Sequence, residues 1–204
     1  MTSSTRKYPY AATAVVAAVL AGCATAQPIP SLSSPDSAGL VVDITQRAPV
    51  RIFTFSPVRV YFARIDGEGG LLQQRIFRSN YVTGGRAYLL NVPPGTYVFV
   101  GAYCVTRVAF TTSYSKDLVE QSKVTVGVGD LVVMGRYVVD QGWPDRTDDV
   151  ETHYRSVMLS MMSSPGIQYR GTLHEFKEDP RTRLDIVRHA KEDLAGSGWE
   201  DRIR

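Results

Sequence analysis

The fold is decided by the stretch Tyr88-Leu89-Leu90-Asn91-Val92-Pro93-Pro94-Gly95-Thr96-Tyr97-Val98-Phe99, which reads as two apolar runs joined by a turn. Pro presets φ for the second position of a turn and Gly tolerates a positive φ, so Pro93-Pro94-Gly95 is typical of a chain reversal. The β-branched and aromatic residues on either side favour strands. We therefore predict one strand before the turn and a second strand from Thr96 onward.

The same kind of pattern extends outward over residues 39–140. Apolar side chains recur with a two-residue period in 58–62, 72–77 and 123–128, which is the period of a half-buried strand. Glycine- and proline-rich turns separate the runs, and about seven or eight short strands of this type indicate an antiparallel β-sandwich. The segment 123–139 reads as its final hairpin. The predicted fold class is mainly β, with residues 39–140 as the sandwich domain.

The pattern over 88–99 resembles the strand-turn-strand of transthyretin-like and carboxypeptidase-regulatory-like sandwich modules. In those modules an apolar strand meets Pro-x-Gly-x-Tyr, and this chain has Pro93, Gly95 and Tyr97 at the matching positions. The resemblance implies a β-sandwich in which the next strand returns through the core. It also implies a non-catalytic module, because most modules of this type are non-catalytic.

Residues 141–204 are expected to form a loop followed by an α/β extension that ends in a helix. The segment 169–176 alternates loosely enough for one strand. Asp179 and Pro180 predict a helix N-cap followed by Pro at the first helical position, and Gly196 marks the helix end. We expect this helix to pack on one face or edge of the sheet. Its apolar residues at helical spacing are Leu184, Val187, Ala190 and Leu194.

Residues 1–22 read as a signal peptide. Arg6 and Lys7 form a short positive region, and an apolar run of about eleven residues follows. Such a run makes about 16 Å of helix, half of a hydrocarbon core, so it indicates an export signal and not a membrane span. Its end, Leu20-Ala21-Gly22-Cys23, resembles the lipobox of bacterial lipoproteins. An ordinary secretory peptide is the alternative, because Ala24-Thr25-Ala26 also has an A-x-A cleavage form.

The lipobox resemblance implies that Cys23 is the site of lipidation. In that family the cysteine becomes the first residue of the mature chain and carries a diacylglycerol, usually with a third acyl chain. Two or more acyl chains hold a protein stably on a bilayer, so the membrane is the first expected partner. In enterobacterial-type lipoproteins an Asp after the cysteine retains the protein in the inner membrane. Ala24 therefore favours the outer membrane, with the protein facing the periplasm.

Residues 23–38 read as the lipidated cysteine followed by a flexible linker. After Cys23 the sequence is ATAQPIPSLSSPDSA, which is rich in Ser and Pro and poor in large apolar residues. A segment of this composition buries too little apolar surface to order itself.

The charge of the mature chain differs from that of the full sequence. Loss of residues 1–22 removes Arg6 and Lys7 but no acidic residue, so the formal net charge of +3 falls to +1. The basic residues are also evenly scattered. Neither feature indicates a nucleic-acid partner.

Few residues carry an expected chemistry, and no cofactor is expected. Acylation of Cys23 leaves Cys104 as the single thiol, and its apolar neighbours predict a buried, unreactive side chain. His153, His174 and His189 show no metal-binding spacing. A solvated acidic loop, with weak potential as a Ca²⁺ site, is formed by Asp145, Asp148, Asp149 and Glu151.

Three functions of different classes follow from these observations. The favoured one is a lipid-anchored, non-catalytic envelope protein that docks a partner protein or supports an envelope assembly. The alternative is a lipoprotein that binds a small ligand, glycan or lipid. The third is a hydrolase whose site is assembled from distant residues, such as His153 or His174 with the acidic loop.

Overall fold

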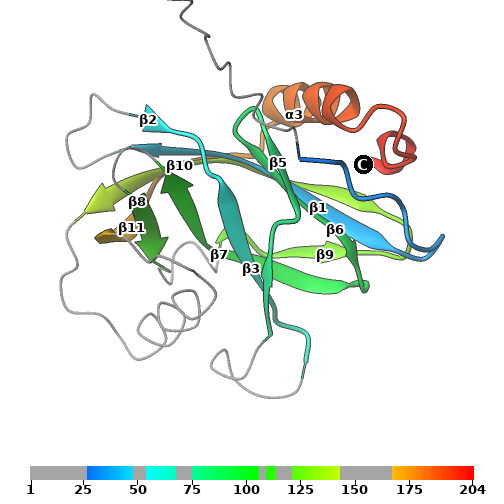
Figure 1. Ribbon diagram of the computed structural model, residues 1–204, viewed down its shortest axis with the longest axis horizontal. Coiled ribbons are helices and arrows are strands. Elements are labelled where there is room, and N and C mark those ends of the chain that lie inside the picture. Colours follow the sequence, from blue (N-terminus) through cyan, green and yellow to red (C-terminus); the bar gives the residue numbers. More distant parts are fainter. Residues whose placement is uncertain (1–26, 48–53, 68–74, 106–108, 114–120, 143–166) are drawn as a thin grey trace, which may run out of the picture.

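The computed structural model describes residues 27–47, 54–67, 75–105, 109–113, 121–142 and 167–204 (Figure 1). This part of the chain is mainly β, with one α-helix near its end, which confirms the predicted fold class. The helical elements are α3 (Pro180–Asp193) and the short 3-10 helix η2 (Glu200–Arg202). The strands are β1 (Ala38–Arg47), β2 (Thr54–Phe55), β3 (Arg59–Arg64), β4 (Ile76–Arg78), β5 (Tyr81–Thr83), β6 (Arg86–Val92), β7 (Gly95–Val105), β8 (Ala109–Ser113), β9 (Val124–Val126), β10 (Leu131–Gly142) and β11 (Ile167–Lys177).

The strands pair along one path, β4-β3-β7-β8-β11-β10-β1-β6-β5, with β2 added on β1 and β9 added on β7. The path folds over, so that β3 and β7 face β1, β6 and β10 as the two layers of a sandwich (Figure 1). Most of these pairings are antiparallel, as predicted. Among the described strands, β1 with β10 and β8 with β11 are parallel, and each of these pairs joins parts of the chain that are far apart in sequence, as a parallel pair requires.

The first hydrophobic core lies between the two layers. Its aromatic side chains contact one another across strands: the Tyr137 ring stacks on Phe176 with centroids 4.8 Å apart, and lies 5.8 Å from the ring of Phe99. These contacts join β10, β11 and β7. The residues that β1 contributes to this core are Ala38, Leu40, Val42 and Ile44.

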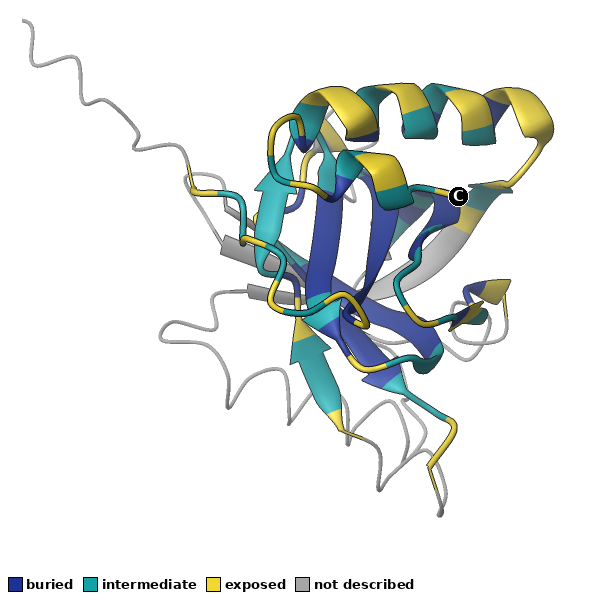
Figure 2. Ribbon diagram, turned by 90° about the vertical axis from the view of Figure 1, so that its right-hand side faces the viewer, coloured by how far each residue is buried: buried dark blue, intermediate teal, exposed yellow. Residues whose placement is uncertain are grey.

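A second core lies on the opposite face of β1, β6 and β10, where α3 covers the sheet. Figure 2 shows the helix lying across this face above buried strands. The predicted packing of the helix on the sheet is therefore confirmed. Strand β1 is buried on both sides as a result, and its first seven residues are all buried. The second core consists of Val41, Tyr88, Leu90, Leu131, Val133, Ile186, Ala190, Leu194 and Trp199.

The turn between β6 and β7 carries the chain from one layer to the other, because β6 pairs with β1 and β5 whereas β7 pairs with β3, β8 and β9. The expected positive φ at Gly95 is wrong: the left-handed residue here is Asn91, with φ of 62°. Gly95 provides space instead, because a Cβ there would lie 2.6 Å from Nε of Arg64. The Tyr97 hydroxyl donates to the Pro93 carbonyl at 2.7 Å and closes the turn.

The hairpin predicted over 123–139 is wrong. Strand β9 pairs with β7, and β10 pairs with β1 and β11. A strand has only two hydrogen-bonding edges, and both edges of β10 are occupied by strands that are longer than β9. The two segments therefore belong to different places in the sheet although they adjoin in sequence.

The flexible linker predicted over 23–38 is wrong for its described part. Ile29 and Leu32 pack against the second core, so residues 27–37 are docked on the domain. The composition argument failed because two apolar residues, spaced three apart, suffice when the folded domain already offers an apolar surface. We call residues 27–37 the docked segment.

Hydrogen bonds from distant side chains fix the docked segment. The Trp199 indole N–H donates to the Pro30 carbonyl at 3.1 Å. The Asn91 side chain accepts from the Ser33 N–H at 2.9 Å and donates to the Ser31 carbonyl at 2.8 Å. The left-handed Asn91 therefore joins the docked segment to the corner between the two layers.

The C-terminal extension belongs to the same folded unit as the sandwich. Strand β11 pairs with β10 and β8, and α3 covers the second core. The boundary predicted between residues 140 and 141 falls inside β10, which ends at Gly142.

The second core generates a stability prediction. Ile186→Ala removes a fully buried side chain of α3 and should lower the free energy of unfolding by about 2–4 kcal/mol, since the cavity adds to the lost burial. Leu184→Ala is the matched control on the same helix, because Leu184 is 69% exposed and its loss should change stability by less than about 0.5 kcal/mol. Chemical denaturation measures both, and equal losses would contradict the assigned orientation of α3.

Candidate functional site

Helix α3 begins at the predicted N-cap. One Asp179 carboxylate oxygen accepts from the N–H groups of Arg181 at 3.0 Å and Thr182 at 3.1 Å, and the other accepts from the Thr182 hydroxyl at 2.6 Å. These bonds, with that from the Thr182 hydroxyl foremost, lower the pKa of Asp179. The cap thereby satisfies orphan N–H groups of the first turn and sets the position of Arg181.

The buried face of α3 differs from the predicted one. Ala190 and Leu194 are buried as expected, but Leu184 is 69% exposed, and Thr182 and Ile186 are buried in its place. Burial of a threonine is tolerated here because its hydroxyl is bonded to the N-cap. Thr182, Ile186, Ala190 and Leu194 recur every four residues, and this spacing marks the buried face. A search restricted to apolar residues misses it because it leaves out Thr182.

The exposed face of α3 is net positive: three basic side chains and one acidic side chain, Glu192, accompany one apolar side chain. The basic and apolar members recur at spacings of three, four and three residues, so they lie along one side of the helix. Sequence reasoning passed over this set because it followed the apolar positions. We call it the cationic stripe, and it consists of Arg181, Leu184, Arg188 and Lys191.

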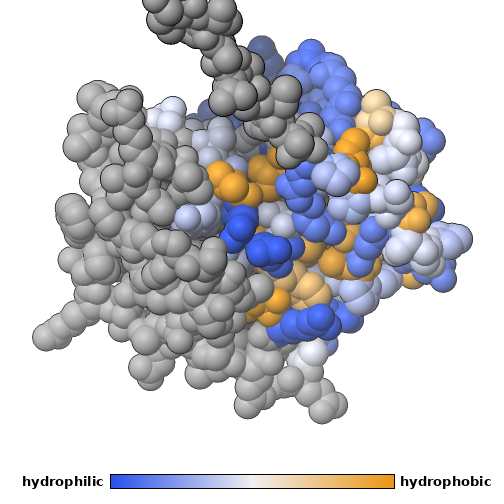
Figure 3. Space-filling view, viewed as in Figure 1, coloured by the Kyte–Doolittle hydropathy of each residue, from blue (hydrophilic) through white to orange (hydrophobic). Residues whose placement is uncertain are grey.

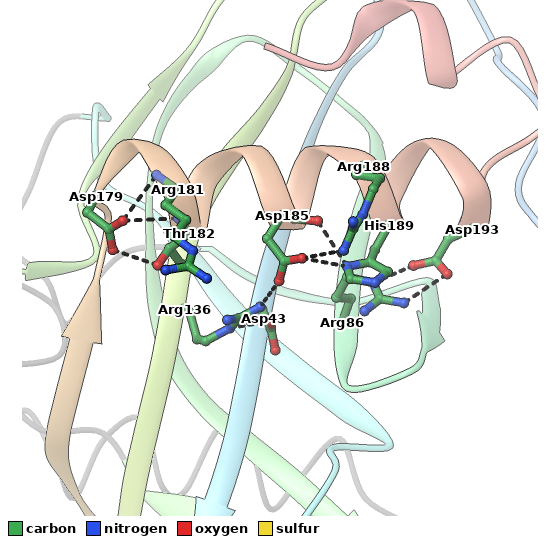
Figure 4. A network of polar contacts seen from close by, with 10 residues as sticks. All are labelled: Asp43, Arg86, Arg136, Asp179, Arg181, Thr182, Asp185, Arg188, His189 and Asp193. Carbon is green, nitrogen blue, oxygen red and sulfur yellow. Dashed lines mark hydrogen bonds and ion pairs between the residues drawn. The ribbon is translucent and has the colours of Figure 1, made fainter.

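A cavity of about 630 Å³ lies between the cationic stripe and β10, and we call it the α3 pocket. Figure 4 shows how its charged side chains reach it from the helix above and from the strands below. Three arginines and one aspartate give it a positive balance. The lining residues are Arg136, Arg181, Thr182, Leu184, Asp185 and Arg188.

Arg136 of β10 connects the floor of the α3 pocket to the helix. Its Nε donates to Asp43 of β1 at 2.7 Å, and a terminal nitrogen donates to Asp185 of α3 at 2.8 Å. The hydrogen bond from Arg136 is the main cause that lowers the pKa of Asp185, and the charges of His189 and Arg188 add to it. Asp185 is therefore ionised at neutral pH, and the pocket holds fixed charges.

A second ion pair holds the C-terminal end of α3. Arg86 of β6 donates to both carboxylate oxygens of Asp193, at 2.6 Å and 3.0 Å, and the side chains are only 13% and 12% exposed. The Tyr88 hydroxyl donates to the same carboxylate, and burial together with this bond raises the pKa of Tyr88 far above its usual range. Tyr88 stays protonated and serves as a donor. This arrangement positions the helix, since all its polar groups bond to one another.

The two described histidines lie apart from each other. His174 of β11 is exposed, as expected for a strand surface, with Nδ1 3.4 Å from Asp140. Nδ1 of His189 lies 2.9 Å from the Asp185 carbonyl of its own helix. His153 and the acidic loop lie outside the described residues, so the hydrolase site considered from the sequence stays a hypothesis.

The acidic-loop residues Asp145, Asp148, Asp149 and Glu151 also lie outside the described residues, so the weak Ca²⁺ site stays a prediction. In the part of the chain that the structure describes, no three His, Cys, Asp or Glu side chains are grouped to hold a metal ion.

The two cysteines are untested as sites. Cys23 precedes the described residues. Cys104 lies in β7, but the structure describes only its backbone. The lipid anchor and the buried thiol therefore stay predictions. The described helices include none with the length and apolar character needed to cross a bilayer.

The Arg86–Asp193 pair generates a second stability prediction. Asp193→Ala leaves a buried guanidinium and the Tyr88 hydroxyl without their acceptor, and it should lower the free energy of unfolding by about 3–5 kcal/mol. Arg188→Ala removes an ion pair whose arginine side chain is 66% exposed, and should change stability by less than about 1 kcal/mol. Thermal denaturation compares them. A small effect of Asp193→Ala would contradict the role of the Arg86–Asp193 pair in holding α3.

No protein-family model, curated protein or solved structure matches the chain. Its function is therefore inferred from its own residues, and the observations of most weight are the docked segment, the cationic stripe and the α3 pocket.

Proposed function

We propose that the chain is a lipid-anchored, non-catalytic protein of the bacterial envelope that docks an acidic partner protein on the cationic stripe. The anchor is Cys23, and the membrane is the outer membrane, with the protein facing the periplasm. The observation that carries the docking proposal is the exposed row of Arg181, Arg188 and Lys191 around Leu184 on a helix that is fixed to the sheet.

The lipobox Leu20-Ala21-Gly22-Cys23 supports the anchor. The docked segment adds a structural argument, because it begins at Gln27, four residues after the cysteine. A free linker of fifteen residues would let the domain sample every orientation. Docking of this segment leaves a short connection, which suits a domain that presents one chosen side to a partner in the envelope.

The geometry of α3 supports docking. The N-cap, the Arg136 bridges and the Arg86–Asp193 pair fix the helix, so little conformational freedom is lost when a partner binds its outer side. An exposed leucine with basic side chains on either side of it along the helix matches an apolar contact flanked by polar ones, as interfaces have. Charge complementarity then requires carboxylates on the partner.

A small anionic ligand is the second candidate, and the α3 pocket is the observation that favours it. A volume of about 630 Å³ accommodates a small molecule, and its guanidinium groups suit a carboxylate or phosphate. Three of its lining residues, Arg181, Leu184 and Arg188, also belong to the cationic stripe. Substitutions in the stripe therefore test both candidates, and the captured species distinguishes them.

The proposed lipid anchor predicts in which cell fraction the protein is found. Cys23→Ala should move the protein from the membrane fraction and abolish metabolic labelling with palmitate, because the acylated sulfur is gone. Cys104→Ala is the matched control and should leave both unchanged. Membrane retention of the Cys23→Ala protein, after a carbonate wash, would contradict the anchor.

The cationic stripe predicts a loss of crosslinking. Arg181→Glu/Arg188→Glu should reduce the yield of a specific protein adduct, formed by crosslinking in intact membranes, at least about tenfold, because like charges then face each other. Lys123→Glu/Lys177→Glu reverses two other exposed charges and should leave the yield unchanged. Equal loss in both variants would mean that net charge, and not the stripe, governs binding.

A further inference from the structure

A second cavity, of about 410 Å³, lies beside the start of the docked segment. It is formed by three parts of the chain: the first described residue, the beginning of β3 and the turn between β4 and β5. We call it the Gln27 pocket, and its lining residues are Gln27, Val58, Arg59, Arg78, Ser79 and Asn80.

The Gln27 pocket is positively charged. Arg59 and Arg78 contribute two guanidinium groups, and none of its six lining residues is acidic. Neither arginine forms an ion pair within the described ranges, whereas Arg47, Arg64, Arg86 and Arg136 each do. On the face of the molecule that Figure 3 shows, strongly hydrophilic residues lie beside apolar ones near the middle.

The wall of the Gln27 pocket is held by hydrogen bonds to neighbouring strands. Ser79 exchanges two bonds with Val60: its N–H donates to the Val60 carbonyl at 2.7 Å, and its hydroxyl accepts from the Val60 N–H at 2.9 Å. The Asn80 amide likewise pairs with both backbone groups of Leu90, at 2.8 Å and 2.9 Å. The turn that carries Arg78 is therefore preformed.

Tyr61 adds a buried donor next to these arginines. It shares a face of β3 with Arg59 and is paired with Arg78 in the β3–β4 register. Its side chain is fully buried, and within the described ranges its hydroxyl is the one buried side-chain polar atom that makes no hydrogen bond. Burial raises the pKa of Tyr61 while the nearby charges of Arg59 and Arg78 oppose that rise. Tyr61 does not itself line the Gln27 pocket, whose charged lining residues are Arg59 and Arg78.

The docked segment places the Gln27 pocket close to the proposed anchor. The Gln27 amide donates to the Asn80 carbonyl at 2.6 Å, so Gln27 is held at the rim of the pocket. Four residue steps separate Gln27 from Cys23 and span at most about 14 Å. The polar headgroup layer on each side of a bilayer is roughly 5–7 Å thick. A pocket this near an acylated cysteine is therefore within reach of the lipid headgroups.

We propose that the Gln27 pocket binds the phosphate of an anionic phospholipid headgroup in the membrane that holds the anchor. The inference rests on the proposed lipid anchor and adds a second, non-covalent membrane contact. Two guanidinium groups bind phosphate oxygens with charge-assisted hydrogen bonds, and a phosphodiester keeps its charge at every physiological pH. Val58, which is 45% exposed on the rim, contacts the apolar part of the interface.

The experiment uses the acylated protein reconstituted in nanodiscs that contain phosphatidylcholine and a small fraction of photoactivatable phosphatidylglycerol. Adducts are mapped by mass spectrometry to peptides that contain residues 56–66 and 75–80. At low lipid occupancy the yield follows affinity. Because each arginine near an anionic surface contributes about fivefold, Arg59→Ala or Arg78→Ala should lower the yield about fivefold, and the double variant about 25-fold.

Two controls keep the result interpretable. Lys123→Ala/Lys177→Ala removes the same number of exposed charges elsewhere and should leave the adduct yield unchanged. Arg59→Lys/Arg78→Lys keeps the charge and should retain part of the yield. Hydrogen-exchange protection of the doubly buried strand β1 reports in each variant that the domain is folded.

The outcomes separate this inference from the anchor on which it rests. Failure of the wild-type protein to enter nanodiscs would overturn the anchor and, with it, the headgroup contact. Entry with equal adduct yields in wild-type and double-alanine proteins would overturn the headgroup site alone. Competition by millimolar inorganic phosphate that abolishes the adducts would show that the pocket takes a free anion, which also overturns the lipid source.

Discussion

Burial of β1 on both faces is the constraint on which the other elements depend. One face of this strand lies in the first core and the other lies under α3, so every neighbouring layer must be complementary to it. Asp43 is a buried carboxylate within the strand: it is 9% exposed, and a carboxylate in that position needs a cationic partner. Arg136 provides it and extends the same guanidinium to Asp185. The strand that organises the hydrophobic layers therefore also determines where the helix is bonded.

Fixation of α3 explains why one helix can have two unlike sides. Its inner side is apolar apart from Thr182, whose hydroxyl is bonded to the N-cap. Ion pairs at Asp185 and Asp193 hold the helix to the sheet at two points. The outer side of the helix takes no part in these contacts. The positive charges there are not needed to hold the helix in place, because the charges that do so are those partly buried at the sheet.

The sequence predicts the local elements well because their signals are local. The Asp179-Pro180 cap, the Pro93-Pro94 turn and the alternating runs each act within a few residues, and the sandwich with a covering helix follows from them. The pairing of β9 with β7, the docking of Ile29 and Leu32, and the exposure of Leu184 depend on surfaces made by distant residues. Periodicity does not identify the first two, whereas the four-residue recurrence from Thr182 to Leu194 does mark the buried face of α3. The Gln27 pocket also depends on residues that are distant in sequence, since Gln27, Arg59 and Arg78 meet only after three segments have folded.

Asn91 has a mechanical consequence. It occupies the corner where the chain passes between the two layers, and its side chain also forms hydrogen bonds with the backbone of Ser31 and Ser33. A pull on the N-terminal end of the docked segment is therefore resisted in turn by the bond from Gln27 to Asn80, by the Trp199 indole and by this corner, before it reaches β1. In the proposed lipid-anchored protein, the docked segment would take up force from the membrane before that force reaches the sandwich core.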